Sequence, residues 1–129
     1  MRLATRTLLL AAVLASGIAS GALAGTGSVS ATPTSAVQAS GSEFRIALSR
    51  NQVAPSKLRL EFVNYGEDEH DLAVRRVGTS LVRNLGTTLP GERSVKRFKV
   101  RRGTYLMWCT ISDHRERGMK ATLKVRKSN

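Results

Sequence analysis

The stretch GTYLMWCTISDHRERGMKATLKV, residues 103–125, has two apolar segments on either side of a charged loop. After the loop, apolar side chains alternate with others: Met119, Ala121, Leu123 and Val125. Alternation with a period of two is typical of a β-strand with one buried face. We therefore predict a strand over 103–109 that ends in Cys109, a connecting loop, and a last strand that Met119 opens.

The same period of two recurs upstream. Four more runs show it: Phe44, Ile46 and Leu48; Leu58, Leu60 and Phe62; Leu72 and Val74; Phe98 and Val100. Turn-forming residues separate the runs, for example at 54–56, 64–66 and 90–91. No stretch has the 3.6-residue period of an amphipathic helix. Short alternating strands at such intervals predict an all-β fold, an antiparallel β-sandwich or small barrel.

The first 24 residues have the pattern of a secretory signal peptide. Arg2 and Arg6 give a basic start, residues 7–15 are apolar, and Ala22-Leu23-Ala24 is a small-residue cleavage motif. We therefore expect an exported protein of the periplasm, the cell envelope or the extracellular space. Because 7–24 approaches the ~20 residues that span a bilayer, an uncleaved segment is the alternative, and it would tether the protein to the membrane.

Residues 25–42 are small, polar and uncharged. Such a composition buries too little area to offset the entropy of ordering a chain. We interpret 25–42 as a flexible Ser/Thr/Ala/Gly linker and 43–129 as the one folded domain.

The chain is strongly basic, with 21 Lys and Arg against 9 Asp and Glu and a formal net charge of +12. This excess favours anionic partners through salt-dependent attraction. We predict no nucleic-acid partner, because an exported protein rarely meets one and the basic residues are dispersed along the sequence. Acidic redox proteins are the expected partners of a monomer, and an anionic envelope or membrane surface is a candidate for peripheral association.

Cysteine and histidine are scarce. One Cys excludes an internal disulfide and a zinc site built from several thiolates, and two His are too few for a multicopper oxidase. Cys109, His114 and Met119 follow one another as Cys-x4-His-x4-Met, and the other His is His70. A thiolate, an imidazole and a thioether suit copper, and a second imidazole completes a His2Cys set with a weak axial Met.

Each of these residues has an ordinary alternative. A lone Cys is most often a small buried core residue, and a lone Met fills gaps in a core. Together they indicate a copper site, because the single Cys and both His of the chain occupy the positions that such a site needs. A free thiol in an exported protein is also prone to oxidation unless it is buried or metal-bound.

Residues 57–125 resemble a cupredoxin, the blue-copper domain of plastocyanins, azurins and auracyanins. Three segments carry the resemblance: LEFVNYG at 60–66 with His-Asp-Leu at 70–72, the Pro90-Gly91 turn, and 103–125. It implies a Greek-key antiparallel β-sandwich of about seven or eight strands, with 43–129 as the copper-binding domain. It also implies one type 1 copper ion, with His70, Cys109 and His114 as equatorial ligands and Met119 as the axial ligand.

Two residues near the ligands are candidates for supporting them, Asn64 and Asp71. Asn64 lies in the turn before His70, and Asp71 replaces the Asn that often follows the first ligand and braces the ligand loop in this family. A carboxylate near the thiolate would stabilise oxidised copper and lower the reduction potential. Charged residues surround His114, which favours an electrostatic mode of partner recognition.

The resemblance implies a one-electron carrier rather than an enzyme, because four protein ligands leave no position open for a substrate. Electron entry is assigned to His114, and Trp108, which points away from the Cys109 face, is a second candidate. The alternative is a copper-binding or copper-delivery protein of the cell envelope. A nitrite reductase needs further His ligands, and a two-copper centre of the CuA type needs a second Cys.

Overall fold

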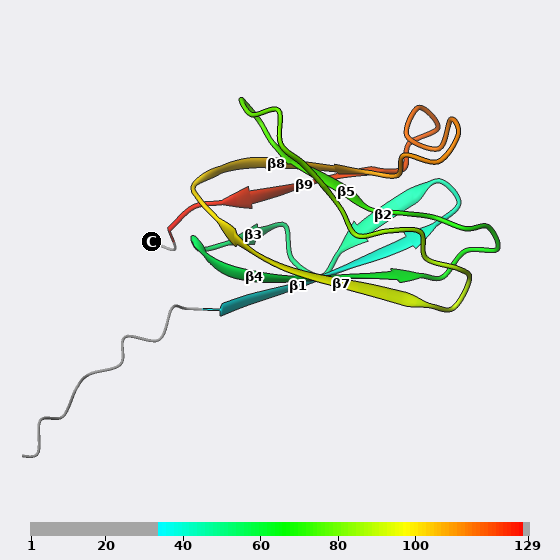
Figure 1. Cartoon of the computed structure of the whole chain (residues 1–129), viewed down its shortest axis with the longest axis horizontal. Coiled ribbons are helices and arrows are strands. Elements are labelled where there is room, and N and C mark those ends of the chain that lie inside the picture. Colours follow the sequence, from blue (N-terminus) through cyan, green and yellow to red (C-terminus); the bar gives the residue numbers. More distant parts are fainter. Residues whose placement is uncertain (1–33, 128–129) are drawn as a thin grey trace, which may run out of the picture.

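Nine strands form the regular structure of residues 34–127, the part of the chain that the computed structural model describes (Figure 1). No helix occurs in this range. The strands are β1 Thr34–Ser42, β2 Arg45–Leu48, β3 Gln52–Val53, β4 Ser56–Asn64, β5 Ala73–Arg76, β6 Val82–Asn84, β7 Arg93–Val100, β8 Gly103–Trp108 and β9 Lys120–Val125.

The strands form two sheets that pack face to face. One has the order β2-β1-β4-β7 and the other the order β3-β9-β8-β5-β6. The predicted all-β sandwich is therefore confirmed, although both sheets are mixed: β1 pairs with β4, and β3 with β9, in the parallel sense. The order of strands along the sequence does not reveal such pairings, because each joins segments that are not consecutive.

Alternation along the strands builds the core between the sheets. Leu58, Leu60 and Phe62 of β4 are fully buried, and Met107 of β8 and Leu123 of β9 meet them from the other sheet. Burial of each such side chain contributes roughly 1.5–3 kcal/mol relative to exposure. The strands that the sequence pattern predicts most clearly thus supply the largest core residues.

The first strand corrects the predicted domain boundary. Residues 34–42 are not a linker but form β1, which lies between β2 and β4 with Val37 and Ala39 buried. Their small side chains suit this place: a Cβ at Gly41 would lie 2.5 Å from the Phe62 ring. The folded domain therefore begins at Thr34 rather than at residue 43. The predicted signal peptide and residues 25–33 lie outside the described range.

The pairing places the loops at two opposite ends of the sandwich (Figure 1). We call one the metal end: it comprises the 43–44 turn and the loops 65–72, 85–92 and 109–119. The other, the far end, comprises the first residues of β1 and β4, the last residues of β5 and β7, the turns 77–81 and 101–102, and the segment after Leu123. Within 34–127, no helix is long and apolar enough to cross a membrane.

Candidate metal centre

Three potential ligands from two distant segments meet at the metal end. The Nδ1 atoms of His70 and His114 are 3.2 Å apart, and Cys109 Sγ lies 4.0 and 3.7 Å from them. Nitrogen and sulfur ligands at bond lengths of about 2.0 and 2.3 Å around one ion lie roughly 3.5–3.8 Å from each other in a trigonal arrangement. The triangle therefore fits a single metal ion bound by two imidazoles and a thiolate.

The Cys109 side of the triangle comes from the end of β8. Cys109 N–H donates to Met119 O at 3.1 Å, and Met119 N–H donates to His114 O at 2.9 Å. These two bonds close the 109–119 loop. They hold Cys109, His114 and Met119 together directly before β9. Met119 lies directly before β9 rather than within it, and its side chain is fully buried.

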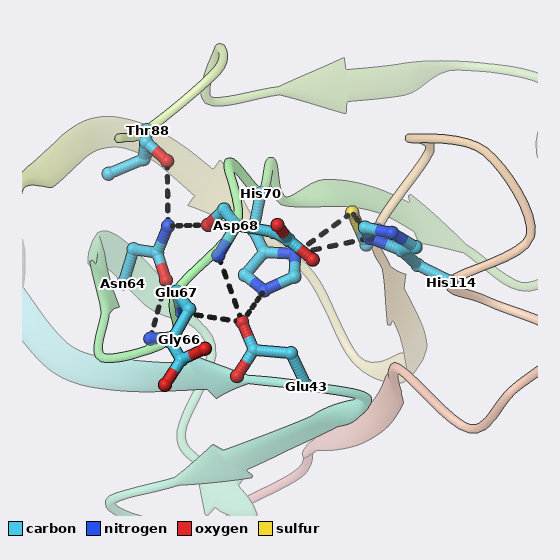
Figure 2. A network of polar contacts seen from close by, with 9 residues as sticks. Glu43, Asn64, Gly66, Glu67, Asp68, His70, Thr88 and His114 are labelled. Atoms are coloured by element: carbon cyan, nitrogen blue, oxygen red, sulfur yellow. Dashed lines mark hydrogen bonds and ion pairs between the residues drawn. The ribbon is translucent and has the colours of Figure 1, made fainter. Parts of the chain in front are cut away.

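His70 is fixed by the strand-like pairing of its backbone. Its N–H donates to Thr88 O at 3.1 Å, and Thr88 N–H donates to His70 O at 2.7 Å. Asn64 supports this pair: its Nδ2 donates to Thr88 O at 2.9 Å and to Asp68 O at 2.7 Å, and its Oδ1 accepts from Gly66 N–H at 2.8 Å (Figure 2). The buried Asn64 amide thus holds the loop that carries His70.

Glu43 contacts the other nitrogen of the His70 ring. Its Oε1 lies 3.3 Å from His70 Nε2, so that Figure 2 shows the imidazole between Glu43 and His114. An ionised Glu43 accepts a hydrogen bond from the Nε2–H of His70, which leaves Nδ1 unprotonated and able to bind a metal. Carboxylate–histidine pairs of this kind orient the ring and increase its basicity.

Backbone amides keep Glu43 ionised. Its Oε1 accepts from Asp68 N–H at 3.1 Å and from Glu67 N–H at 2.6 Å. These bonds, that from Asp68 above all, hold the pKa of Glu43 at about 2. Sequence reasoning missed this residue, because Glu43 lies 27 positions before His70 and no local motif links the two.

Asp71 connects the His70 loop to the Cys109 loop. Its Oδ1 accepts from Thr110 N–H at 2.6 Å, and its Oδ2 accepts from the Thr110 hydroxyl and from Asn84 Nδ2. Asp71 therefore braces the segment after Cys109, a role that the resemblance gives to Asn. Burial raises the pKa of the Cys109 thiol, and the Asp71 charge adds to the increase. A metal cation would offset both effects.

His114 lies closer to the surface than His70. The His114 residue is 8% exposed, and its ring packs edge to face against Phe44, with ring centroids 5.1 Å apart. The Arg117 guanidinium covers the Phe44 ring at 3.3 Å, and Arg115 lies over Trp108 at 4.7 Å. Trp108 is partly exposed whereas Cys109 is fully buried, as the alternation along β8 predicts.

Comparisons with known proteins identify the fold. No protein-family model and no curated protein matches the sequence. Among solved structures, auracyanin A, a "blue" copper protein from Chloroflexus aurantiacus, is 14% identical with a TM-score of 0.59, over 73% of this chain and all of that one. Rusticyanin from Thiobacillus ferrooxidans is 16% identical with a TM-score of 0.59, over 72% of this chain and 77% of that one.

The same fold also occurs within a larger protein. A multicopper oxidase is 18% identical with a TM-score of 0.50, over 72% of this chain but only 41% of that one. The likeness to these solved structures identifies the fold. The triangle of His70, Cys109 and His114 at its metal end fits a single metal ion. The chain is thus a cupredoxin-like sandwich in which two histidines and the single cysteine form a site suited to one type 1 copper ion.

Proposed function

We propose that this protein is an exported type 1 copper protein that carries single electrons between redox partners. The observation that supports this most strongly is the buried triangle of His70, Cys109 and His114. A bound copper ion supplies a change between the +2 and +1 states. Two imidazoles and a thiolate suit both states, so little rearrangement accompanies the transfer.

Met119 is proposed as the weak axial ligand. Two observations support this role: its backbone bonds to Cys109 and His114, and its side chain is fully buried. With four protein ligands around the ion, no position stays open for a substrate, which favours a carrier over an enzyme.

Burial also favours a carrier over copper delivery. His70 and Cys109 are fully buried, and the 109–119 loop closes over them through its bonds to Met119. A protein that hands copper to a partner needs ligands that the partner can reach. Electrons, in contrast, can pass through the His114 edge, which comes nearest to the surface, or by way of Trp108.

Export and partners complete the proposal. The basic start, apolar run and small-residue motif within 1–24 support secretion, and the mass of the exported product tests cleavage after Ala24. The redox partner is proposed to be an acidic protein whose carboxylates pair with Arg115 and Arg117, the two arginines of the 109–119 loop, rather than with the acidic residues of the surrounding loops. This protein is proposed to be a monomer. We propose no nucleic-acid partner.

The direct test is the visible spectrum after copper(II) is added to the purified protein. We expect one equivalent to bind, with an intense blue thiolate-to-copper band that ascorbate bleaches. Cys109→Ser should abolish the band, whereas Ser112→Ala, an exposed control in the same loop, should keep it. A colourless wild-type complex, or a blue Cys109→Ser variant, would contradict the proposal.

A further inference from the structure

Folding separates charges that are dispersed along the sequence. Eight of the nine acidic residues lie in the loops of the metal end: Glu43, Glu67, Asp68, Glu69, Asp71, Glu92, Asp113 and Glu116. The ninth, Glu61, lies within β4 and pairs with Arg59 and Arg93. The far end has no acidic residue. It carries eight basic ones: Lys57, Arg76, Lys99, Arg101, Arg102, Lys124, Arg126 and Lys127.

Part of this basic surface is a hollow with a volume of about 270 Å³. Four cations line it, namely Arg76, Lys99 and Arg101 of the far end together with Arg83 of β6. None of the four is paired with a carboxylate in the described part of the chain. Four unpaired positive charges around one hollow make a site for anionic groups such as phosphates.

The lining of the hollow is held in place by contacts within the protein. Arg76 donates from Nε and Nη2 to Arg102 O at 3.0 and 2.7 Å, and the Arg83 guanidinium lies over the Phe98 ring at 5.0 Å. The Tyr105 hydroxyl accepts from Arg101 N–H at 3.0 Å and donates to Arg101 O at 3.1 Å. The Arg76 and Arg83 side chains, fixed in this way, lose little further freedom when an anion binds.

Exposed aliphatic residues lie next to these cations. Val77 and Leu81, in the turn between β5 and β6, are 54% and 56% exposed, and Leu81 also lines the hollow. In Figure 1 this green hairpin projects from the sandwich away from the orange 109–119 loop. Cations beside a projecting apolar tip match the boundary between anionic headgroups and acyl chains.

The described part of the chain also begins at the far end. The chain enters the fold at Thr34, which pairs with Lys57 at the far end. The 33 residues before it include the apolar run 7–15 with two arginines ahead of it. Where this segment is retained rather than cleaved after Ala24, its composition suits a membrane, and it joins the domain at the end where the cations gather.

We propose that the far end docks onto the anionic headgroup surface of a phospholipid membrane, with the metal end directed away from it. Phosphates occupy the hollow lined by Arg76, Arg83, Lys99 and Arg101, and the 77–81 turn reaches the interface. The orientation matters for electron transfer and to that extent rests on the proposed function. Docking itself involves no metal ligand, so it can be tested on the copper-free protein.

The first test measures binding of the full chain to vesicles of phosphatidylcholine, with and without half phosphatidylglycerol, at low and high salt. We expect binding that requires phosphatidylglycerol and is lost as salt rises. Lys99→Glu/Arg101→Glu should weaken it about tenfold or more. The control Arg45→Glu/Arg115→Glu makes the same change in net charge at the metal end and should alter it less than about twofold.

Several outcomes would overturn the proposal. Equal binding to both vesicles would mean that the apolar N-terminal run acts alone, and equal losses in the two variants would mean that only net charge matters. Heparin serves as a soluble polyanion. If Lys99→Glu/Arg101→Glu lost heparin binding while vesicle binding was unchanged, the far end would be a site for a polymer instead.

The second test measures orientation by fluorescence quenching with brominated lipid in the same anionic vesicles. Trp108 is the single tryptophan and lies at the metal end of β8, so the wild-type protein should be quenched little. Leu81→Trp in a Trp108→Phe background should be quenched strongly. The reverse pattern would place the metal end on the membrane and refute the proposed orientation, whether or not copper binds.

Discussion

The two histidines of the site are supported in different ways. His70 is fully buried and is held by the Thr88 pairing, the Asn64 amide and the Glu43 carboxylate. His114 belongs to a loop closed by turn-like bonds and packs against Phe44 near the surface. The difference shows that the His70 side of the site fixes the geometry, whereas the His114 side lies close to solvent. The following predictions test this difference between the two sides.

The largest effect is expected from Asn64→Ala. The change removes the buried amide, which leaves Asp68 O without this donor and Thr88 O with only the His70 N–H. We expect a loss of about 2–4 kcal/mol in the free energy of unfolding. Denaturant titration checks this, and Asn51→Ala, at an exposed turn, should change stability by less than about 0.5 kcal/mol. Similar losses in both variants would mean that the His70 side is not specially braced.

Glu43→Gln should weaken copper binding with a smaller effect on folding. The neutral amide cannot fix the proton on His70 Nε2 as a carboxylate does, and it makes the imidazole a poorer donor. We expect about 10–100-fold lower copper affinity and a higher reduction potential. Competition with a chelator and a redox titration measure the two quantities. Glu69→Gln is an exposed control in the nearby loop, and an equal decrease in that variant would contradict a specific role for Glu43.

Acid should destabilise the fold in part through Glu43. Because its pKa falls from 4.5 in the unfolded chain to about 2 in the folded protein, the ionised form stabilises the fold above the unfolded value. This contribution is lost as the pH falls from about 4.5 toward 2. Unfolding of the copper-free protein at several pH values should show this decrease. Glu43→Gln should reduce the decrease without abolishing it, since Arg59 also lowers the pKa of Glu61.

The smallest effect on stability is expected on the His114 side. Arg117→Ala removes a guanidinium that covers the Phe44 ring at the surface. We expect a change in unfolding free energy of about 0.5–1 kcal/mol, together with slower electron exchange with an acidic partner. Stopped-flow reduction at two salt concentrations tests the second part. A loss of stability as large as that of Asn64→Ala would remove the distinction between the two sides.

The sequence pattern predicted what depends on local alternation and on rare residue types. Leu58, Leu60 and Phe62 alternate clearly, and the single Cys with the two His marks the three candidate ligands that the fold brings together. β1 was missed because its residues are small, and their place between two strands depends on partners such as Phe62. Glu43 was missed because its contact with His70 joins two turns that only the folded sheet brings together. The separation of charge likewise arises only on folding.

The chain enters the sandwich at Thr34 and completes its last strand at Val125, both at the end remote from the His-Cys-His triangle. A tag, linker or fused domain at either terminus therefore leaves the site unobstructed. A protein attached to a gold electrode through its C-terminus would present His114 to the solution rather than to the metal surface. Direct current to the electrode should then be weak, whereas a dissolved mediator should restore it.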